Sequence, residues 1–214
     1  MDRLLKILFF GLLVKPIVFV ILGLNLRDRK NLPKIGPAVI VANHNSHLDT
    51  LVLMSLYPLS MIHKIRPVAA ADYFLERGGL RAWVSKKCIG IIPMDRSGST
   101  EKQHLFKACT QALERGEILI LFPEGSRGEP ETMSELKKGV YYLIKESPKT
   151  CVTPVMLHGL GRALPKGTAL LVPFNCDVII GRAIPDKNGP EEFVREVESN
   201  FQRLSQHCLT REHG

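Results

Sequence analysis

A stretch dense in chemically active side chains runs from Val39 to Met54 and reads VIVANHNSHLDTLVLM. It holds His44 and Asp49 between two apolar runs, where a strand is expected to end and a helix to begin. In a helix, two side chains five residues apart point about 140° away from each other and could not meet. We therefore expect His44 in the loop and Asp49 in the first helical turn. Asp49 would accept a hydrogen bond from one imidazole nitrogen while the other nitrogen takes a proton from a hydroxyl. The pair therefore predicts general-base chemistry.

Two other interpretations of this stretch stay open. Ser46-x-x-Asp49 resembles a capping box, in which the acid serves the helix start, and this role is compatible with the first. His44, His47 and Asp49 also form H-x-x-H-x-D, a pattern of metal-ligand clusters and so of metallohydrolases. A metal site usually needs more distant ligands, and of the remaining histidines only His158 lies at an expected strand end. No metal site is therefore predicted.

Two later loops carry cationic and small residues suited to a phosphate. The sequence LFPEGSRG, from Leu121 to Gly128, offers backbone N–H groups, the Ser126 hydroxyl and the Arg127 guanidinium in one turn. The sequence GIIPMDR supplies a second arginine, Arg96, just past another expected strand. Taken alone, either loop is also compatible with an ordinary surface turn.

Short β-branched runs alternate with longer runs of helical period from Pro37 onward. Strands are expected at 38–43, 66–70, 88–94, 117–122, 151–157 and 176–181, and helices at 48–56, 73–86, 101–115, 134–145 and 191–208. This alternation predicts a single α/β domain whose mostly parallel or mixed sheet is flanked by helices. The polar loops that follow the strands would then cluster at one sheet edge, where such folds bind ligands.

An apolar segment from Leu4 to Leu26 precedes that domain and is long enough to cross a membrane. Because Lys15-Pro16 interrupts it, two short helices embedded in one leaflet are expected, with Lys15 reaching the head groups. A membrane span in which Lys15 snorkels or pairs stays open. Residues 1–36 carry seven Lys or Arg and two Asp, a net charge of 7 − 2 = +5. They are expected to form a basic-flanked anchor on anionic lipid, ahead of a catalytic domain at 37–214.

The composition limits the compartment and the partners. Of the 214 residues, 45% are hydrophobic and 23% are charged, as in a globular protein. The five cysteines are scattered and form no C-x-x-C pair, which favours a reducing compartment over a disulfide framework or a zinc knuckle. The net charge of +8 indicates a membrane surface, and no nucleic-acid partner is expected because aromatic residues do not interleave with the basic ones.

The order and spacing of the motifs strongly resemble those of the glycerolipid acyltransferases that acylate glycerol-3-phosphate and lysophosphatidic acid. The matching motifs are H-x4-D at 44–49, G-x4-D-R at 90–96, F-P-E-G-S-R at 122–127 and V-x-P-V at 152–155. The likeness covers about 37–161. Ser126 stands where threonine is common, and Pro93-Met94 replaces a bulkier pair. These departures bear on the choice of acceptor and leave the His44–Asp49 pair intact.

The resemblance implies roles for particular side chains. His44 would be the general base and Asp49 its orienting partner. The substrate-binding residues would be two arginines that contact the acceptor phosphate and three residues that shape and hold the loop, namely Arg96, Arg127, Glu124, Gly125 and Ser126.

The reaction that the resemblance implies is transfer of a fatty acyl group from acyl-CoA or acyl-carrier protein to the free hydroxyl of 1-acylglycerol-3-phosphate. The product would be phosphatidic acid, and no cofactor is implied because the thioester is itself the acyl donor. The alternatives are glycerol-3-phosphate or another lyso-lipid as acceptor, a non-catalytic lipid-binding protein, and a metallohydrolase. The expected location is the cytoplasmic face of the inner or plasma membrane.

Overall fold

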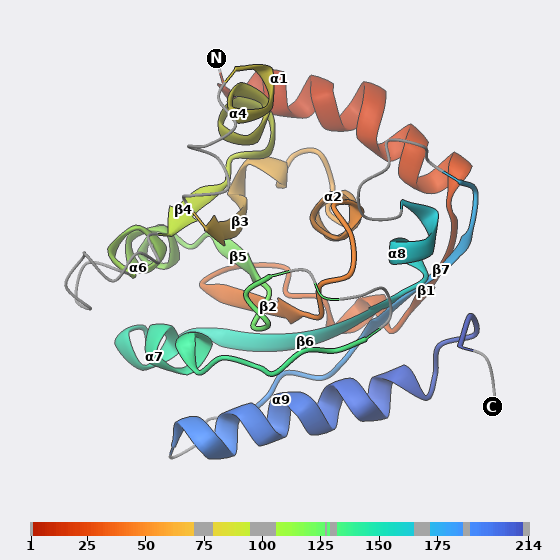
Figure 1. Ribbon diagram of the computed structural model, residues 1–214. Coiled ribbons are helices and arrows are strands. Elements are labelled where there is room, and N and C mark those ends of the chain that lie inside the picture. The colour runs from red at the N-terminus through yellow and green to blue at the C-terminus, as the bar shows by residue number, and fades with distance from the viewer. Residues whose placement is uncertain are drawn as a thin grey trace.

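The computed structural model describes residues 2–70, 79–94, 106–126, 128, 132–164, 172–185 and 189–211. A mixed sheet lies at its centre, made of β1 Gly23–Arg27, β2 Ala38–Ala42, β3 Ile65–Ala70, β4 Ile92–Met94, β5 Ile118–Leu121, β6 Cys151–His158 and β7 Asn175–Ile180. The strand order is β1-β7-β6-β2-β5-β3-β4 (Figure 1). Only the β6–β7 pair is antiparallel among the paired strands described. The predicted α/β domain with a mixed sheet is confirmed.

Helices cover both faces of this sheet (Figure 1). One face carries the helix formed by residues 2–21, together with α2 Leu48–Ser55 and α8 Leu160–Ala163. The opposite face carries α6 Lys107–Glu114, α7 Gly139–Glu146 and α9 Pro190–Ser205. Shorter pieces complete the described chain: α4 Leu80–Trp83, η3 Arg29–Asn31, η4 Ile62–Lys64 and η5 Val84–Ile89.

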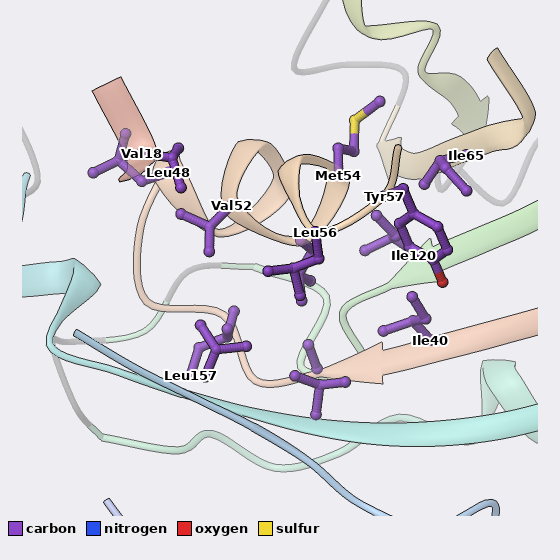
Figure 2. Close-up of a cluster of buried hydrophobic side chains, with 14 of the residues drawn as sticks. Val18, Ile40, Leu48, Val52, Met54, Leu56, Tyr57, Ile65, Ile120 and Leu157 are labelled. Atoms are coloured by element: carbon purple, nitrogen blue, oxygen red, sulfur yellow. The ribbon is translucent and has the colours of Figure 1, made fainter. Parts of the chain in front are cut away.

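The central strands are buried on both faces, which explains their continuous apolar runs. Every residue of β2 is buried, and so is every residue of β5. Because successive side chains of a strand point to opposite faces, Ile40 and Ile120 belong to the cluster beneath α2, while Val39 and Leu119 belong to the other one. Figure 2 shows Ile40 and Ile120 facing the side chains of α2, with Leu157 from β6 and Val18 from the N-terminal helix closing the cluster.

The expected break at Lys15-Pro16 is wrong, because residues 2–21 form one continuous helix. It comprises α1 Asp2–Leu8 and two π-helical stretches, η1 Phe9–Val14 and η2 Ile17–Ile21. Pro16 keeps helical dihedrals of φ −56° and ψ −45°. The π-helical turns on either side change the hydrogen-bond register, and this accommodates a residue that has no N–H to donate.

The N-terminal helix buries every fourth residue along a single face, namely Lys6, Phe10, Val14 and Val18, and Leu22 just after the helix continues the series. In a regular α-helix each step of four residues drifts by about 40° around the axis, so five such positions would not share a face. The wider π-helical turns offset this drift. The helix therefore presents one continuous face to the core, which is apolar except for Lys6 near its start.

Lys15 and the residues after the helix also differ from expectation. The Lys15 ammonium does not reach outward but donates to the carbonyl oxygen of Tyr57 at 2.8 Å. The expected helical character through Leu26 is wrong, because β1 begins at Gly23 and pairs with β7. Residues 1–36, expected as an anchor ahead of the domain, thus contribute a strand to the sheet.

Other predicted boundaries shift for local reasons. The strand expected at 88–94 begins only at Ile92, because η5 extends to Ile89 and Gly90 ends it with a φ of +75°. The helix expected at 134–145 begins at Gly139, because the preceding residues lie along the 123–128 loop. The helices expected at 73–86 and 101–115 fall partly outside the described residues. Within the described residues, α4 and the start of η5 lie in the first range and α6 lies in the second.

A buried cation fastens the start of the N-terminal helix to the sheet. The Lys6 side chain is 4% exposed, and its ammonium donates to the carbonyl oxygen of Ile65 at 2.9 Å. Burial, reinforced by the nearby charge of Arg66 and opposed by that of Glu117, lowers the pKa of Lys6 to about 7. In the native state Lys6 therefore loses its proton near pH 7, whereas in the unfolded chain it keeps the proton up to a pH of about 10.4.

This buried lysine predicts a stability that rises with pH. Between about pH 7 and 10.4 the unfolded chain binds more protons than the native one, so the free energy of unfolding increases across that window. Lys6→Met should flatten this rise and stabilise the protein at pH 6, where the wild type must bury a charge. Chemical denaturation in detergent at a series of pH values measures the slope. Lys64→Met, at an exposed neighbouring lysine, is the matched control and should keep it; an unchanged slope in Lys6→Met would contradict the prediction.

Candidate active site

The carboxyl ends of β2, β5 and β6 lie side by side, because these three strands are parallel neighbours. The Asn43 side chain extends the pairing of β2 with β6 beyond the end of β2. Its amide nitrogen donates to the carbonyl oxygen of Leu157 at 2.8 Å, and its amide oxygen accepts from the Leu157 N–H at 2.7 Å. The turn that follows Asn43 therefore starts from a fixed position at the sheet edge.

His44 and Asp49 meet in this turn, as the sequence predicted. The Nδ1 atom of His44 lies 2.9 Å from Oδ2 of Asp49, whose side chain is fully buried, while the His44 side chain is 19% exposed. A carboxylate only accepts, so Nδ1 carries the proton and Nε2 is left as an acceptor. The predicted hydrogen bond is confirmed, and the arrangement suits a general base; the catalytic roles themselves stay a prediction.

The same carboxylate oxygen also organises the backbone of the turn. Oδ2 of Asp49 accepts from the N–H groups of Asn45 at 2.7 Å and Ser46 at 2.8 Å. The bond from Ser46 is the reciprocal half of a capping box, and the Ser46 hydroxyl oxygen accepts from the Leu48 N–H at 3.3 Å. The structural and the catalytic interpretations of Asp49 are therefore compatible, as expected.

Phe122, just past β5, packs flat against the imidazole. The ring centroids of His44 and Phe122 lie 4.0 Å apart and their planes differ by 18°. With Nδ1 bound to Asp49 and one ring face covered, the imidazole has a fixed plane and direction. Sequence analysis missed this contact, although the aromatic residue at the head of F-P-E-G-S-R was a signal for it.

Glu124 joins three segments at the site. Its side chain is buried; Oε1 accepts from the backbone N–H of His44 at 2.7 Å and Oε2 from that of Ser134 at 2.9 Å. Burial raises the pKa of the Glu124 carboxyl, and these two N–H bonds partly offset that effect. The expectation that Glu124 holds its own loop was too narrow, because this carboxylate also holds the backbone of His44.

Residues 123–126 and 128 lie beside this carboxylate, and we call the segment 123–128 the phosphate loop after the role that the resemblance implies for it. Gly125 has a φ of +80°, and a Cβ atom added there would lie 2.9 Å from Nζ of Lys137. A Cβ at Gly128 would lie 2.9 Å from Oγ of Ser134, so both glycines permit close packing. Ser126 is exposed. The predicted residues Arg96 and Arg127 lie outside the described residues.

The alternative metal cluster gains no support from the described part of the chain. His47 lies at the start of α2 and is exposed. Among the described residues no group of three or more His, Cys, Asp or Glu side chains is placed to hold a metal ion.

Comparison with known proteins agrees with the predicted resemblance. A family model described as Acyltransferase matches residues 23–158, more than half of the chain. The chain is 28% identical over 168 residues to a chloroplastic 1-acyl-sn-glycerol-3-phosphate acyltransferase of Arabidopsis thaliana, which covers 75% of this chain and 43% of that protein. It is 28% identical over 146 residues to a 1-acyl-sn-glycerol-3-phosphate acyltransferase of Helicobacter pylori, covering 59% of this chain and 53% of that protein.

The fold is shared with a solved structure. The crystal structure of the 1-acyl-sn-glycerophosphate acyltransferase from Thermotoga maritima superimposes with a TM-score of 0.73 at 18% identity. The match covers 96% of this chain and 81% of that chain. The chain spans about half the length of the two curated relatives described above.

Glu124 predicts a measurable change in backbone protection. In Glu124→Gln the side chain presents one oxygen and one NH₂ group, so one of the two part-buried N–H groups, of His44 or Ser134, loses its acceptor. An unpaired buried donor costs about 1–3 kcal/mol, so amide exchange at His44 or Ser134 should accelerate roughly 5- to 150-fold. Hydrogen exchange resolved by residue measures this. The exposed Glu135→Gln should leave both amides protected, and unchanged exchange in Glu124→Gln would show that the carboxylate does not hold the two segments.

Proposed function

The chain belongs to the acyltransferase family, and on that premise we propose that it transfers a fatty acyl group from an acyl thioester to the free hydroxyl of 1-acylglycerol-3-phosphate, giving phosphatidic acid. The names of the Arabidopsis and Helicobacter relatives support this acceptor. The observation that carries the proposal is the bond from His44 Nδ1 to the buried carboxylate of Asp49, which leaves Nε2 ready to accept a proton.

The reaction follows from this geometry. Nε2 of His44 takes the proton of the acceptor hydroxyl as its oxygen attacks the thioester carbonyl. The new ester C–O bond forms, the C–S bond breaks, and the leaving thiolate receives the proton back from the imidazolium. Asp49 stabilises the positive imidazolium through Nδ1, and Phe122 holds the ring in its plane. No acyl-enzyme is needed.

The acceptor phosphate is bound next to the general base. Arg96 and Arg127 supply charge-assisted hydrogen bonds to it, with Gly125 and Ser126 shaping the phosphate loop. Support for this placement comes from Glu124, because its carboxylate bonds the backbone of His44 and lies within the phosphate loop. Hydroxyl and phosphate belong to one small glycerol unit, so their two binding groups have to be close.

The acyl donor is acyl-CoA or acyl-carrier protein, and the thioester is a substrate, so no cofactor is needed. Glycerol-3-phosphate or another lyso-lipid is the alternative acceptor. A panel of acceptors offered to the purified protein in detergent, with product lipids identified by mass, separates these. A protein that binds lipid without catalysis gives no product with any of them.

Replacement of the general base tests the mechanism. His44→Ala should lower acyl transfer by about 10²–10⁴-fold with the fold intact, because a positioned base contributes that much. Turnover of 1-acylglycerol-3-phosphate with labelled acyl-CoA measures this, and circular dichroism checks the fold.

His47→Ala is the matched control, because His47 lies three residues away and outside the proposed mechanism; it should stay close to wild type. Near-normal turnover in folded His44→Ala would refute the proposed base. Loss of activity on chelation, with His47 as essential as His44, would instead favour the metallohydrolase.

The N-terminal helix supports a membrane location. Residues Arg3–Ile21 form a helix that is long and apolar enough to cross a membrane by length and composition. Every exposed side chain from Leu4 to Ile21 is apolar, and both lysines of that stretch turn inward to backbone carbonyls. The outward face is therefore purely apolar. The large exposed side chains are Leu4, Leu8, Leu12, Leu13, Phe19, Val20 and Ile21.

The helix lies in the plane of one leaflet and does not cross the bilayer. Its inner face is part of the protein core along the whole length of the helix, through Phe10, Val14 and Val18. A helix fastened in this way cannot enter hydrocarbon on all sides, whereas its outer face can sink into the boundary of one leaflet. The exposed Lys30 and Lys34 face anionic head groups. The five free cysteines support the cytoplasmic side of that membrane.

Charges placed on the outer face test this arrangement. Leu12→Glu and Val20→Glu should each weaken binding to vesicles that contain anionic lipid, by about tenfold or more, because each large apolar side chain contributes about 1.5–3 kcal/mol on burial. Vesicle flotation measures the bound fraction. Leu209→Glu, which changes an equally exposed leucine off the helix, should bind normally.

Sidedness is tested by labelling Asp2→Cys and Lys30→Cys with an impermeant thiol reagent in intact and opened vesicles. Only Cys151 is exposed among the natural cysteines, so both labelling variants also carry Cys151→Ser to remove background reaction with the thiol reagent. Labelling of both positions from the same side is expected, and labelling from opposite sides would establish a span.

A further inference from the structure

A lysine that neither the motifs nor the proposed mechanism accounts for lies over the phosphate loop. A Cβ atom built on Gly125 would approach Lys137 at three successive atoms, with Nζ at 2.9 Å, Cε at 3.1 Å and Cδ at 3.2 Å. The end of this side chain thus lies flat across the bare Cα of Gly125. Its ammonium group is held at the surface of the loop.

The backbone of Lys137 is fixed to the same loop. Its N–H donates to the carbonyl oxygen of Pro123 at 2.9 Å. Three residues earlier, the N–H of Ser134 donates to Oε2 of Glu124 at 2.9 Å. The segment 132–137 therefore runs along the phosphate loop and is fastened at two points. The lysine side chain starts from a position that the loop itself determines.

The charge of Lys137 has no acidic partner among the described residues, unlike that of its neighbour. Nζ of Lys138 forms an ion pair with Glu191 at 2.7 Å. Glu124, the acid of the phosphate loop, has each carboxylate oxygen on a backbone N–H. Lys137 is exposed, and its ammonium group is therefore available to an anion that approaches the loop from solvent or membrane.

We propose that Lys137 is a phosphate-binding residue, which contacts the phosphomonoester of the acceptor and selects acceptors that carry one. The inference rests on the proposed function for the identity of the acceptor. Through Glu124, the loop beneath Lys137 is bonded to the backbone of His44. A phosphate held there belongs to the same glycerol unit as the hydroxyl that His44 deprotonates. Lys137 thus joins the proposed Arg96 and Arg127 as a point charge with three donors.

This placement gives Gly125 a second reason to be glycine. Its φ of +80° already disfavours other residues, and any side chain would also push the Lys137 ammonium off the loop. The bare Cα is what lets a lysine lie directly over the turn.

A binding experiment tests the residue without relying on acyl transfer. Glycerol-3-phosphate, a soluble phosphomonoester, is titrated calorimetrically into the wild type and into Lys137→Met, Lys137→Arg and Lys138→Met in detergent. The dissociation constant should rise about tenfold or more in Lys137→Met, because one charge-assisted contact is lost. Lys137→Arg should keep most of the affinity. Lys138→Met removes the same charge one residue away and should bind like the wild type. Equal affinity in Lys137→Met and wild type, or no binding by the wild type, would overturn the proposal.

Steady-state kinetics then identify the source of the phosphate. In Lys137→Met the KM for 1-acylglycerol-3-phosphate should rise about tenfold or more while the KM for acyl-CoA stays near wild type. A rise confined to acyl-CoA would overturn the acceptor assignment, because Lys137 would then contact the donor. If the wild type binds glycerol-3-phosphate through Lys137 but acylates neither it nor 1-acylglycerol-3-phosphate, the proposed function fails while the phosphate site stands.

Discussion

The candidate site depends on two buried carboxylates that bind backbone rather than solvent. A single oxygen of Asp49 accepts from the imidazole of His44 and from the N–H groups of Asn45 and Ser46, so side chain and turn are positioned by the same atom. Glu124 then connects that turn to the phosphate loop and to Ser134. Desolvation is the cost of burying such groups, and N–H donors at hydrogen-bond distance offset it at Oδ2 of Asp49 and at both oxygens of Glu124, whereas Oδ1 of Asp49 has no partner among the described residues. Hydrogen bonds therefore connect His44 and the phosphate loop into one unit, as the preorganised chemistry proposed for them requires.

The two sides of the N-terminal helix have different environments. One side packs in the core, and the other is exposed and apolar. Its π-helical turns keep every fourth side chain directed at the sheet. Its two lysines, which would be costly in hydrocarbon, each donate to a backbone carbonyl of the domain instead. Interior packing and the proposed membrane contact are thus divided between two sides of one helix, and the domain core sets the orientation of both.

Much of the fold was readable from the sequence because β2 and β5 are uninterrupted apolar runs, and β6 is largely apolar, as expected for a sheet covered on both faces. The His44–Asp49 bond was readable as well, since a five-residue spacing across a strand-to-helix turn permits little else. The helix through Pro16 was not, because standard helical rules treat proline as a break and do not include π-helical register changes. Strand β1 was hidden within an apolar segment whose composition suggests helix, and its partner β7 lies far along the chain.

Long-range contacts explain the remaining misses. Glu124 bonds His44 across 80 residues, and the stacking of Phe122 on that imidazole depends on β2 and β5 being neighbours. Lys137 lies over Gly125 because the segment before α7 is not helical, whereas its helical periodicity predicted an earlier helix start. The local sequence pattern predicts helices and strands well, but it does not predict which loops contact each other in the folded protein.

The pairing of β1 with β7 sets the order in which the molecule can be completed. Gly23 lies opposite Asn175, a separation of 175 − 23 = 152 residues, so β1 leaves the ribosome long before its partner exists. At typical rates of synthesis this interval is about 8–30 s. Throughout it, the apolar helix that precedes β1 can pack on α2, η4 and η5, whereas β1 itself has no strand to pair with. Closure of the sheet edge that carries β1 is therefore a late step in the synthesis of this chain, because it waits for a strand encoded near the C-terminal end.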